Sequence, residues 1–347
     1  MDRRDVFPRS LQYLIAIAEY GSFTRAAEAL YVSQPTLSQQ IKQLEESLHA
    51  PLLDRSGRVV QLTDAGEVYL RHARRAWGEL DTGARAIHDV QNLSRGSLRL
   101  GWTPITDYLT CCLIENFNSR YPGITLSTLE MPQDDIEVAV TEGRIDIGIT
   151  FNRSLDMEMG STEIEAQRLF EETLSIAVGN AHPLAGECKQ MTAEEFEQQS
   201  LALLNTNFAL RHHIDQYCLE QGISPHIAID TNSLNVIIEL IQVGPLATIL
   251  PNSIIRTQCG LYSIQLTPAV PQKAITIISR KDGYQSPAYR AFMELAAEWS
   301  TRRKEATPLR KLRHCPFSEA YQAAKSKTTL IVQSKDIAEE NEELDYS

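Results

Sequence analysis

Two short helical segments near the N-terminus, separated by an abrupt break, constrain this chain more than any other part of its sequence. Thr24 precedes the run RAAEAL and is expected to cap the first helix, because its hydroxyl can accept from an unpaired backbone N–H. Ser33 is expected to cap the second helix, and Pro35 suits its first turn, where a missing N–H costs nothing. The apolar residues of that second helix recur at 4-3-4 spacing and predict one buried stripe: Leu37, Ile41, Leu44 and Leu48.

The opposite face of the second helix carries almost only uncharged hydrogen-bonding side chains. These are Gln34, Thr36, Ser38, Gln39, Lys42 and Gln43. Glutamine pairs bidentately with adenine, and serine and threonine hydroxyls adapt to bases and phosphates, so the face suits DNA. An ordinary amphipathic helical hairpin with a solvated polar face is the alternative interpretation.

The segment PLLDRSGRVVQLTDAG favours DNA binding over that alternative. Two short apolar runs flank Ser56-Gly57-Arg58 and predict a β-hairpin whose tip carries Arg55 and Arg58, like the wing of a winged helix-turn-helix. Residues 1–65 are therefore predicted to form a DNA-binding domain. Its expected DNA contacts are Thr24, Arg25, Ser33, Gln34, Pro35, Thr36, Ser38, Gln39, Lys42, Arg55 and Arg58.

The charge of the chain at first argues against a nucleic-acid partner. Its 33 Lys and Arg against 45 Asp and Glu give a formal net charge of −12, whereas DNA is a polyanion. Residues 1–65 hold seven basic and eight acidic side chains, so only −1 of that charge lies there and −11 lies elsewhere. One copy of the domain is expected to bind weakly, and affinity is expected to depend on pairing two copies.

A long helix is predicted from a Thr63 cap to about Leu93, and residues 66–95 are assigned as a linker. Its small and apolar positions are spaced 4-3-4-3-4-3, a heptad seam that favours dimerisation through Gly66, Leu70, Ala73, Trp77, Leu80, Ala84 and Ile87. Pairing would place two recognition helices on successive turns of double-stranded DNA. A single surface helix packed on its own domain is the alternative.

From SRGSLRLGW onward, strands and helices alternate twice, which predicts a mainly parallel α/β architecture over 96–300. We assign lobe I to about 96–165 and 268–300, and lobe II to about 166–267. Ligands of such folds bind at the carboxyl ends of strands, in the cleft between lobes. The expected contacts are Thr103, Pro104, Thr106, Gln133, Thr150, Asn205, Phe208, Thr231 and Asn232, although simple helix capping explains Thr106 equally well.

The segments FTRAAEALYVSQPTLSQQIKQLE, LLDRSGR and LTDAG resemble the DNA-binding domain of LysR-type transcriptional regulators. Leu53 departs from the family's more frequent Phe, which fills the same core position. The resemblance covers residues 1 to about 300. It implies an N-terminal winged helix-turn-helix, a dimerising linker helix, further assembly into tetramers, and a two-lobed effector domain like periplasmic binding proteins. It also implies a cytoplasmic regulator of transcription that has no enzymatic activity.

Within the family, the spans RAIHDV, RGSLR, IDQYC and IIELI resemble regulators of cyanate-detoxifying genes. This implies a very small anion such as cyanate as the ligand, activation of those genes, and repression of the regulator's own gene. Another small anionic or carboxylate metabolite is the alternative ligand. The charged segment 301–347 lies outside the resemblance and is expected to be a disordered extension, with self-association or contact with RNA polymerase as alternatives.

Other functional classes have little support in the sequence. A secretion signal, or a nucleophile with its base, would favour a solute-binding or catalytic α/β protein with an incidental N-terminal helical domain, and neither feature is present in the sequence. An architectural DNA binder would have no reason to carry a two-lobed module. The six cysteines form no C-x-x-C pair and are expected to be buried free thiols. His212 and His213 are expected to face different directions, so no metal or cofactor is expected. No apolar run is long enough to cross a membrane.

Overall fold

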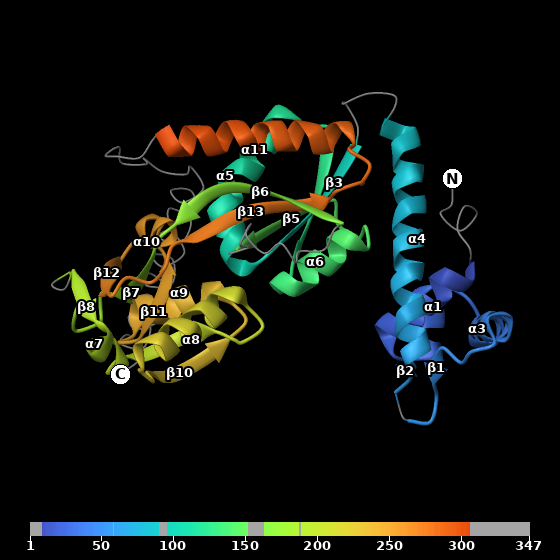
Figure 1. Cartoon of the computed structure of the whole chain (residues 1–347), viewed down its shortest axis with the longest axis horizontal. Coiled ribbons are helices and arrows are strands. Elements are labelled where there is room, and N and C mark those ends of the chain that lie inside the picture. The colour runs from blue at the N-terminus through green and yellow to red at the C-terminus, as the bar shows by residue number, and fades with distance from the viewer. Residues whose placement is uncertain (1–8, 58, 90–95, 152–162, 187–188, 306–347) are drawn as a thin grey trace, which may run out of the picture.

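The structure, a computed structural model, describes residues 9–57, 59–89, 96–151, 163–186 and 189–305. A small helical domain, one long helix and a two-lobed α/β domain follow one another along the chain (Figure 1). The α + α/β fold class predicted from the sequence is confirmed.

The N-terminal domain packs three helices and a two-stranded wing around a small core. Its elements are α1 Arg9–Tyr20, α2 Phe23–Ala29, α3 Gln34–Leu48, and the antiparallel strands β1 Leu53–Asp54 and β2 Gln61–Leu62. Leu14, Ile17, Leu37, Ile41 and Leu52 are fully buried where the helices meet. The packing of these side chains in the core therefore fixes the position of α3, the expected recognition helix, against α1 and the start of the wing.

Two details of this domain differ from the sequence prediction. Ser22, in extended conformation, caps α2 and accepts from the N–H of Arg25, so Thr24 is the second residue of the helix and not its cap. Leu48 is 39% exposed and does not join the buried stripe, because the last turn of α3 extends past the core and ends in a left-handed cap at His49.

The long helix α4 (Asp64–Asp89) stands between the N-terminal domain and the α/β domain (Figure 1). As predicted, Thr63 caps it: the Thr63 hydroxyl accepts from Gly66 N–H at 3.0 Å and donates to the Pro51 carbonyl at 2.7 Å. Leu70 packs into the core of the N-terminal domain. Because α4 is anchored at its first turns, the orientation of the whole domain follows that of the helix.

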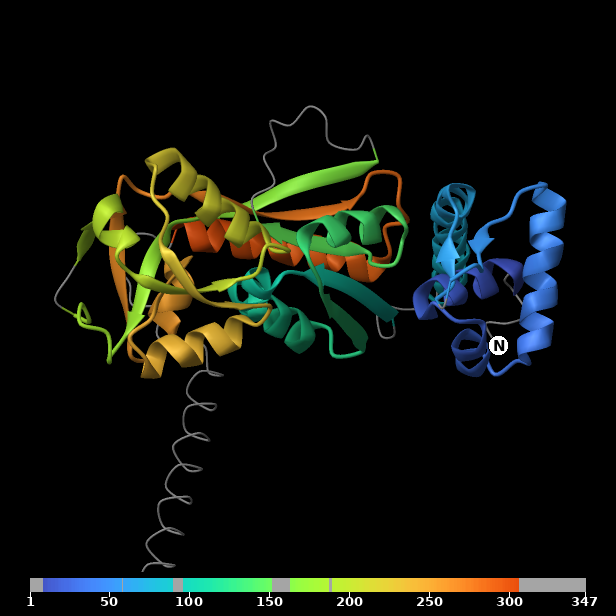
Figure 2. The same cartoon turned by 90° about the horizontal axis from the view of Figure 1, so that it is seen from below.

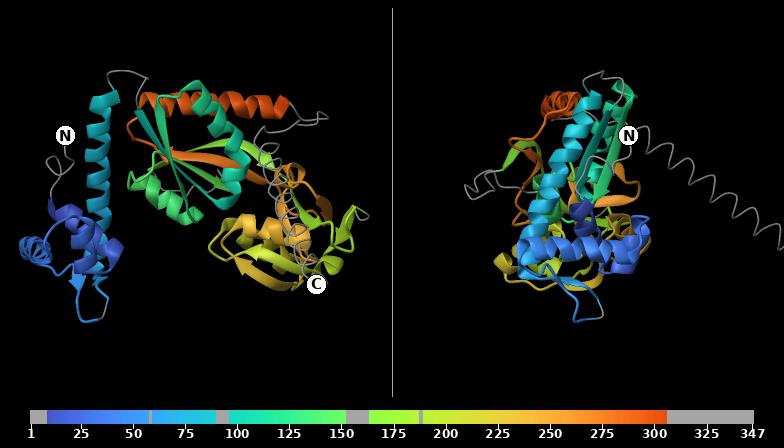
Figure 3. Two further views of the ribbon diagram at one scale, coloured as in Figure 1. Left: turned by 180° about the vertical axis from the view of Figure 1, so that it is seen from behind. Right: turned by 90° about the vertical axis from the view of Figure 1, so that its right-hand side faces the viewer.

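Lobe I contains a five-stranded sheet of order β4-β3-β5-β13-β6. The strands are β3 Gly96–Trp102, β4 Ile124–Glu130, β5 Ile147–Phe151, β6 Ile164–Glu172 and β13 Lys273–Arg280. Strand β3 is parallel to β4 and β5, and β13 is antiparallel to β5 and β6. Its helices are α5 Pro104–Arg120 and α11 Pro287–Glu305 on one face and α6 Gln133–Thr141 on the other, visible in Figure 3.

Lobe II contains a six-stranded sheet of order β10-β9-β11-β7-β12-β8. The strands are β7 Leu174–Gly179, β8 Gln190–Thr192, β9 Ser200–Leu204, β10 His226–Thr231, β11 Ala247–Pro251 and β12 Leu261–Thr267. The helices are α7 Ala193–Glu197, α8 Ala209–Gln221, α9 Leu234–Val243 and α10 Asn252–Thr257. Figure 2 shows this lobe at the end of the molecule remote from the N-terminal domain.

The boundary between the lobes lies later than the sequence predicted. Strand β6 pairs with β13 along its whole length, from Ile164 opposite Arg280 to Glu172 opposite Lys273. Residues 166–172 therefore belong to the sheet of lobe I, and lobe II begins with β7. Among the described residues, no helix is long and apolar enough to cross a membrane.

Candidate nucleic-acid interface and ligand cavity

The start of α3 is organised by a hydroxyl pair. Ser33 caps the helix, its Oγ accepting from Thr36 N–H at 3.2 Å, and the two hydroxyl oxygens lie 2.7 Å apart. Pro35 occupies the second helical position, where it removes no helical hydrogen bond. The remaining N–H groups and the positive end of the helix dipole point outward and suit a phosphate oxygen.

The predicted recognition face of α3 is open to solvent. Six of the seven predicted contacts of α3 and its cap are exposed and Ser38 is half-buried; the exposed ones are Ser33, Gln34, Pro35, Thr36, Gln39 and Lys42. Thr24 and Arg25 are exposed on the neighbouring helix α2. The fold thus brings these side chains to one domain surface while Leu37 and Ile41 hold the helix from behind.

Of the two wing arginines, the structure describes Arg55, whose role in DNA binding stays a prediction. Arg55 pairs with Glu45 of α3 at 2.7 Å and lies over the Phe23 ring, 5.3 Å from its centroid. The other oxygen of Glu45 accepts from the N–H groups of Leu52 and Leu53 at 2.9 and 3.1 Å. Arg55 and Glu45 therefore connect the wing to α3, and the carboxylate of Glu45 neutralises part of the charge of Arg55. Arg58 lies outside the described residues.

The predicted heptad seam divides into two halves along α4. Gly66, Leu70 and Ala73 are buried inside this chain. Gly66 lies against Leu52, and Leu70 packs into the core of the N-terminal domain. Trp77 and Ala84 are half-buried, whereas Leu80 is 38% and Ile87 72% exposed. The exposed half of the seam is the part that a second copy of the chain can cover.

Most of the residues of lobe I that the sequence predicted to contact an effector use their side chains in hydrogen bonds within the lobe. Thr103 and Thr106 are buried in a capping box at the start of α5, and the Thr106 hydroxyl donates to the Ile149 carbonyl at 3.0 Å. Gln133 accepts from Phe151 N–H at 3.1 Å, and the buried Thr150 hydroxyl donates to the Thr276 carbonyl at 3.3 Å. These side chains fix the helices α5 and α6 against the strand ends.

The candidates of lobe II lie at strand ends, as predicted, but also bond within the lobe. Asn205 accepts from Asn207 N–H at 3.1 Å, and the Thr231 hydroxyl accepts from Ser233 N–H at 3.3 Å. Phe208 is buried in the hydrophobic core. Asn232 alone among the four candidates of this lobe lines the cavity between the lobes.

That cavity, of about 260 Å³, lies between the N-terminus of α5 in lobe I and the β10–α9 connection in lobe II. Its lining residues are Pro104, Asp107, Tyr108, Glu130, Asn232, Ser233, Leu234 and Asn235. Of the predicted contacts, Pro104 and Asn232 line it. The Tyr108 hydroxyl donates to the Asn235 Oδ1 atom and so bridges the two lobes at the cavity. Asp107 and Tyr108 directly follow the predicted contact Thr106 in the sequence, and this position in the first turns of α5 was the available signal.

The cavity is acidic. Burial raises the pKa of Asp107 to about 7, the nearby charge of Glu130 adds to this rise, and the Tyr108 N–H opposes it. No Lys, Arg or His side chain is among its lining residues. Asp107 therefore changes between a hydrogen-bond donor and a carboxylate near neutral pH. Among the described residues, no cluster of three or more His, Cys, Asp or Glu side chains would hold a metal ion.

A winged helix-turn-helix joined by a long helix to a two-lobed domain with a cavity between its lobes defines a ligand-responsive DNA-binding regulator of transcription. Comparison with known proteins agrees with this class. Residues 8–67 match the model of bacterial regulatory helix-turn-helix proteins of the lysR family, and residues 91–301 match the LysR substrate binding domain. The chain belongs to the LysR family, as the sequence predicted, and is a regulator and not an enzyme.

Curated relatives align over most of the chain. The uncharacterized HTH-type transcriptional regulator YwbI of Bacillus subtilis is 30% identical over 292 residues, covering 82% of this chain and 94% of the relative. A "Probable RuBisCO transcriptional regulator" of Phaeodactylum tricornutum is 29% identical over 299 residues, again covering 82% and 94%. The alignments thus extend over DNA-binding domain, linker and effector domain together.

Solved structures share the fold. CbnR, a LysR family transcriptional regulator, superposes with a TM-score of 0.60 at 23% identity, covering 84% of this chain and 98% of CbnR. A full-length CbnR structure complexed with its target DNA gives a TM-score of 0.59 at 24% identity, covering 84% and 99%. The order of domains is therefore the same in these proteins.

Proposed function

We propose that a small polar molecule binds the cavity between the lobes and thereby changes the DNA-bound arrangement of this regulator. The observation that carries the proposal is the Tyr108–Asn235 hydrogen bond, because it joins the two lobes at the cavity itself. A ligand that enters the cavity either replaces the Tyr108–Asn235 hydrogen bond or adds hydrogen bonds to the same two residues. Its binding free energy therefore differs between the open and the closed arrangement of the lobes. Such a difference is what a ligand needs to shift a conformational population.

The ligand suggested by the sequence is a small anion such as cyanate. The resemblance to regulators of cyanate-detoxifying genes supports it, together with activation of those genes and repression of the regulator's own gene. In the cavity, protonated Asp107 and the amide groups of Asn232 and Asn235 would donate to such an anion. Anion binding would then take up a proton, so it would weaken as pH rises through about 7.

The acidity of the cavity favours a second ligand class, a molecule with a cationic or hydrogen-bond-donating group. Above pH 7 Asp107 is ionised and lies near the Glu130 carboxylate, and both attract positive charge. Such a ligand would bind more tightly as pH rises. The two classes therefore differ in the sign of their pH dependence.

Thermal unfolding of the full-length chain separates them. Cyanate, azide and formate are compared with methylammonium and guanidinium at pH 6 and pH 8. A ligand present at 100 times its Kd adds about 2.7 kcal/mol to the free energy of unfolding, a rise of several degrees in Tm. Larger anion shifts at pH 6 support the first class, and larger cation shifts at pH 8 support the second. Equal shifts in Asp107→Asn and the natural chain would place the ligand elsewhere.

We further propose how the regulator reads DNA. The exposed face of α3, with Gln34, Gln39 and Lys42, would enter the major groove of double-stranded DNA, and Thr24 and Arg25 would contact phosphates. A homodimer paired through the exposed seam residues of α4, assembled further into a tetramer, would supply the affinity that one nearly neutral domain lacks. Residues 301–347 are proposed to contribute to self-association or to contact RNA polymerase. Sedimentation of the full chain, with and without residues 306–347, tests the assembly.

A further inference from the structure

The turn between α2 and α3 contains an exposed tyrosine in a backbone conformation that disfavours it. Tyr31 has φ +54°, in the left-handed region that residues other than glycine and asparagine rarely adopt. His49, at the cap that ends α3, is the only other non-glycine residue with positive φ among those described. The Tyr31 side chain is 85% exposed, the largest fraction among the exposed large hydrophobic residues of the described chain. Neither the backbone nor the core of the domain therefore favours tyrosine at this position.

The packing on either side of Tyr31 requires the left-handed conformation. Leu30 and Val32 both pack against the core of the N-terminal domain. The N–H of Tyr31 donates to the Glu28 carbonyl at 3.1 Å, and the N–H of Val32 donates to the Ala27 carbonyl at 3.0 Å. The chain reverses between two residues that face the core, so the residue between them faces solvent. Glycine or asparagine would satisfy this geometry with less strain than tyrosine.

The preceding turn of the same domain contains the residue that such geometry favours. Gly21, between α1 and α2, has φ +60°, and a Cβ there would lie 3.0 Å from the Val59 side chain. The chain thus places glycine in one left-handed turn and tyrosine in the next. No side chain in the described part of the chain forms a hydrogen bond or a ring contact with the Tyr31 side chain. The ring and hydroxyl of Tyr31 are therefore available to a partner molecule.

Tyr31 lies directly beside the expected recognition helix. Ser33, which caps α3, follows two residues later, so the two Cα atoms are at most about 7.6 Å apart. Phosphate groups border the major groove that such a helix enters, and tyrosine hydroxyls are among the protein donors that bind them. The domain is nearly neutral, and its Arg55 already pairs with Glu45 at 2.7 Å. A donor that carries no charge is therefore a suitable source of phosphate contacts in this domain.

We propose that the hydroxyl of Tyr31 donates a hydrogen bond to a phosphate oxygen of DNA, beside the groove that α3 enters. The proposal deepens the proposed reading of DNA through α3 and rests on it. Tyr31 is then a positioning residue, because a phosphate contact fixes the domain on the duplex and carries no sequence information. Since the hydroxyl is neutral, the contact adds affinity on every sequence without releasing a counterion of its own.

Binding of the full-length chain to DNA tests the contact. Tyr31→Phe, Tyr31→Asn and the control Tyr284→Phe, at an exposed tyrosine of lobe I, are titrated with two duplexes, one selected from a random pool by the natural chain and one random. Loss of a hydrogen bond to a charged acceptor should weaken binding of both Tyr31 variants to both duplexes by roughly 10-fold. The dependence of affinity on salt should keep its slope. Arg25→Gln, at a predicted cationic contact, should instead lower that slope by about 1.

Thermal unfolding separates a lost contact from a damaged fold. Tyr31→Asn relieves the left-handed conformation, so its Tm should rise by about 2 °C while its DNA affinity falls. Tyr31→Phe keeps both the ring and the conformation, so its Tm should not change. Weakened binding that accompanies a lower Tm in both variants would assign Tyr31 to the stability of the turn and overturn the proposal.

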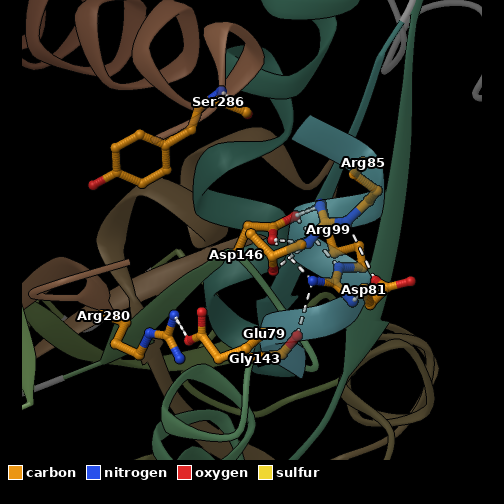
Figure 4. A network of polar contacts seen from close by, with 10 residues as sticks. Glu79, Asp81, Arg85, Arg99, Gly143, Asp146, Arg280 and Ser286 are labelled. Atoms are coloured by element: carbon orange, nitrogen blue, oxygen red, sulfur yellow. Dashed lines mark hydrogen bonds and ion pairs between the residues drawn. The ribbon is translucent and has the colours of Figure 1, made fainter. Parts of the chain in front are cut away.

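The contact between α4 and lobe I shows whether a variant alters the rest of the subunit (Figure 4). Asp146 of lobe I accepts from the Arg99 N–H at 2.9 Å and pairs with Arg85 of α4 at 3.1 Å. Hydrogen exchange at Arg99 should be the same in the natural chain and in both Tyr31 variants, because their change is confined to the turn. Faster exchange at Arg99 would show that the substitution acts through the whole subunit and would count against a local contact.

A series of selected duplexes, each with one methylphosphonate, identifies the phosphate. One substitution should weaken binding of the natural chain and no longer weaken binding of Tyr31→Phe, because the two changes remove the same contact. The absence of such a position, or natural affinity in Tyr31→Phe, would overturn the proposal. Natural DNA affinity with lost activation of transcription would assign Tyr31 to a protein partner instead. If Gln39→Ala changes binding to neither duplex while the Tyr31 variants weaken both, the proposed recognition face fails and the Tyr31 contact stands.

Discussion

The Tyr108 hydroxyl of lobe I donates to the Asn235 amide oxygen of lobe II, and both residues line the cavity together with Asp107 and Glu130. This bond lies across the gap that a ligand of the cavity would occupy. It is therefore the contact through which occupation of the cavity and the relative position of the lobes are most directly linked.

Tyr108→Phe removes the bond across the lobes and keeps the ring. A typical intramolecular hydrogen bond contributes about 1 kcal/mol, so we expect the population of closed lobes to fall roughly fivefold. Small-angle scattering of the ligand-free chain should show a larger radius of gyration. Tyr284→Phe, at an exposed tyrosine of the β13–α11 connection, serves as the control. An unchanged scattering profile in Tyr108→Phe would separate this bond from lobe closure.

Asp107 should make stability fall as pH rises. Its pKa is about 7 in the folded chain against an ordinary value of 3.8, so between these values the folded state binds the proton that the unfolded state has lost. Stability due to this group is full below about pH 4 and is lost as pH rises to about 7. After allowance for solvent screening, we expect roughly 2 kcal/mol. Asp107→Asn should abolish this slope in urea unfolding from pH 5 to 8, and Asp134→Asn, on an exposed carboxyl, should keep it.

Gln39→Ala tests the recognition face. A bidentate glutamine–adenine contact discriminates against the wrong base by about 1–3 kcal/mol, so binding to the selected duplex should weaken by roughly 10- to 100-fold. Binding to random duplex should not change, because phosphate contacts remain. Gln216→Ala, at an exposed position of α8 in lobe II, is the matched control. Both variants are titrated with DNA at a fixed salt concentration. Equal weakening on both duplexes would remove Gln39 from base recognition.

Ile87→Asp tests the exposed half of the seam. Ile87 is 72% exposed within the single chain, so the substitution should leave the stability of the monomer within about 0.5 kcal/mol of the natural chain. A carboxylate in a heptad seam would instead disfavour pairing. Sedimentation equilibrium should shift toward monomer, and DNA affinity should fall with it. Val138→Asp, on the exposed surface of α6, should affect neither.

Local chemistry was sufficient to predict the elements that carry strong patterns. Ser33 and Thr63 are the caps that the sequence predicted for α3 and α4, because a hydroxyl before a helix satisfies N–H groups within three residues. The strongly apolar runs at β5, β7 and β11 are the strands expected from their composition. By contrast, β6, β8 and β12 and the short helices α7 and α10 were not predicted. Strand β12 was missed although its residues Ser263 to Thr267 alternate between exposed polar and buried apolar side chains.

Long-range contacts decided the rest. The sequence predicted Thr106, Gln133 and Thr150 as ligand contacts, and the folded chain uses their side chains for backbone groups that lie up to 126 residues away. The cavity is instead lined by Asp107, Glu130 and Asn235, and these residues lie close together only because of how the sheets of lobe I and lobe II are placed. Likewise, a heptad pattern in α4 predicted one face of the helix, while the contacts of Gly78 and Arg85 with lobe I became evident only from the structure.

The sequence by itself determined the domain order, the recognition helix, the linker helix and the family, because each depends on periodicity, capping and motifs within about 30 residues. The tertiary structure decided where lobe I ends, which side chains face the cavity, and that α4 is clamped to lobe I. The physical reason is that burial, pKa shifts and ion pairs such as Arg85–Asp146 depend on distances between residues remote in the chain, and these distances exist only after the sheets and helices have packed.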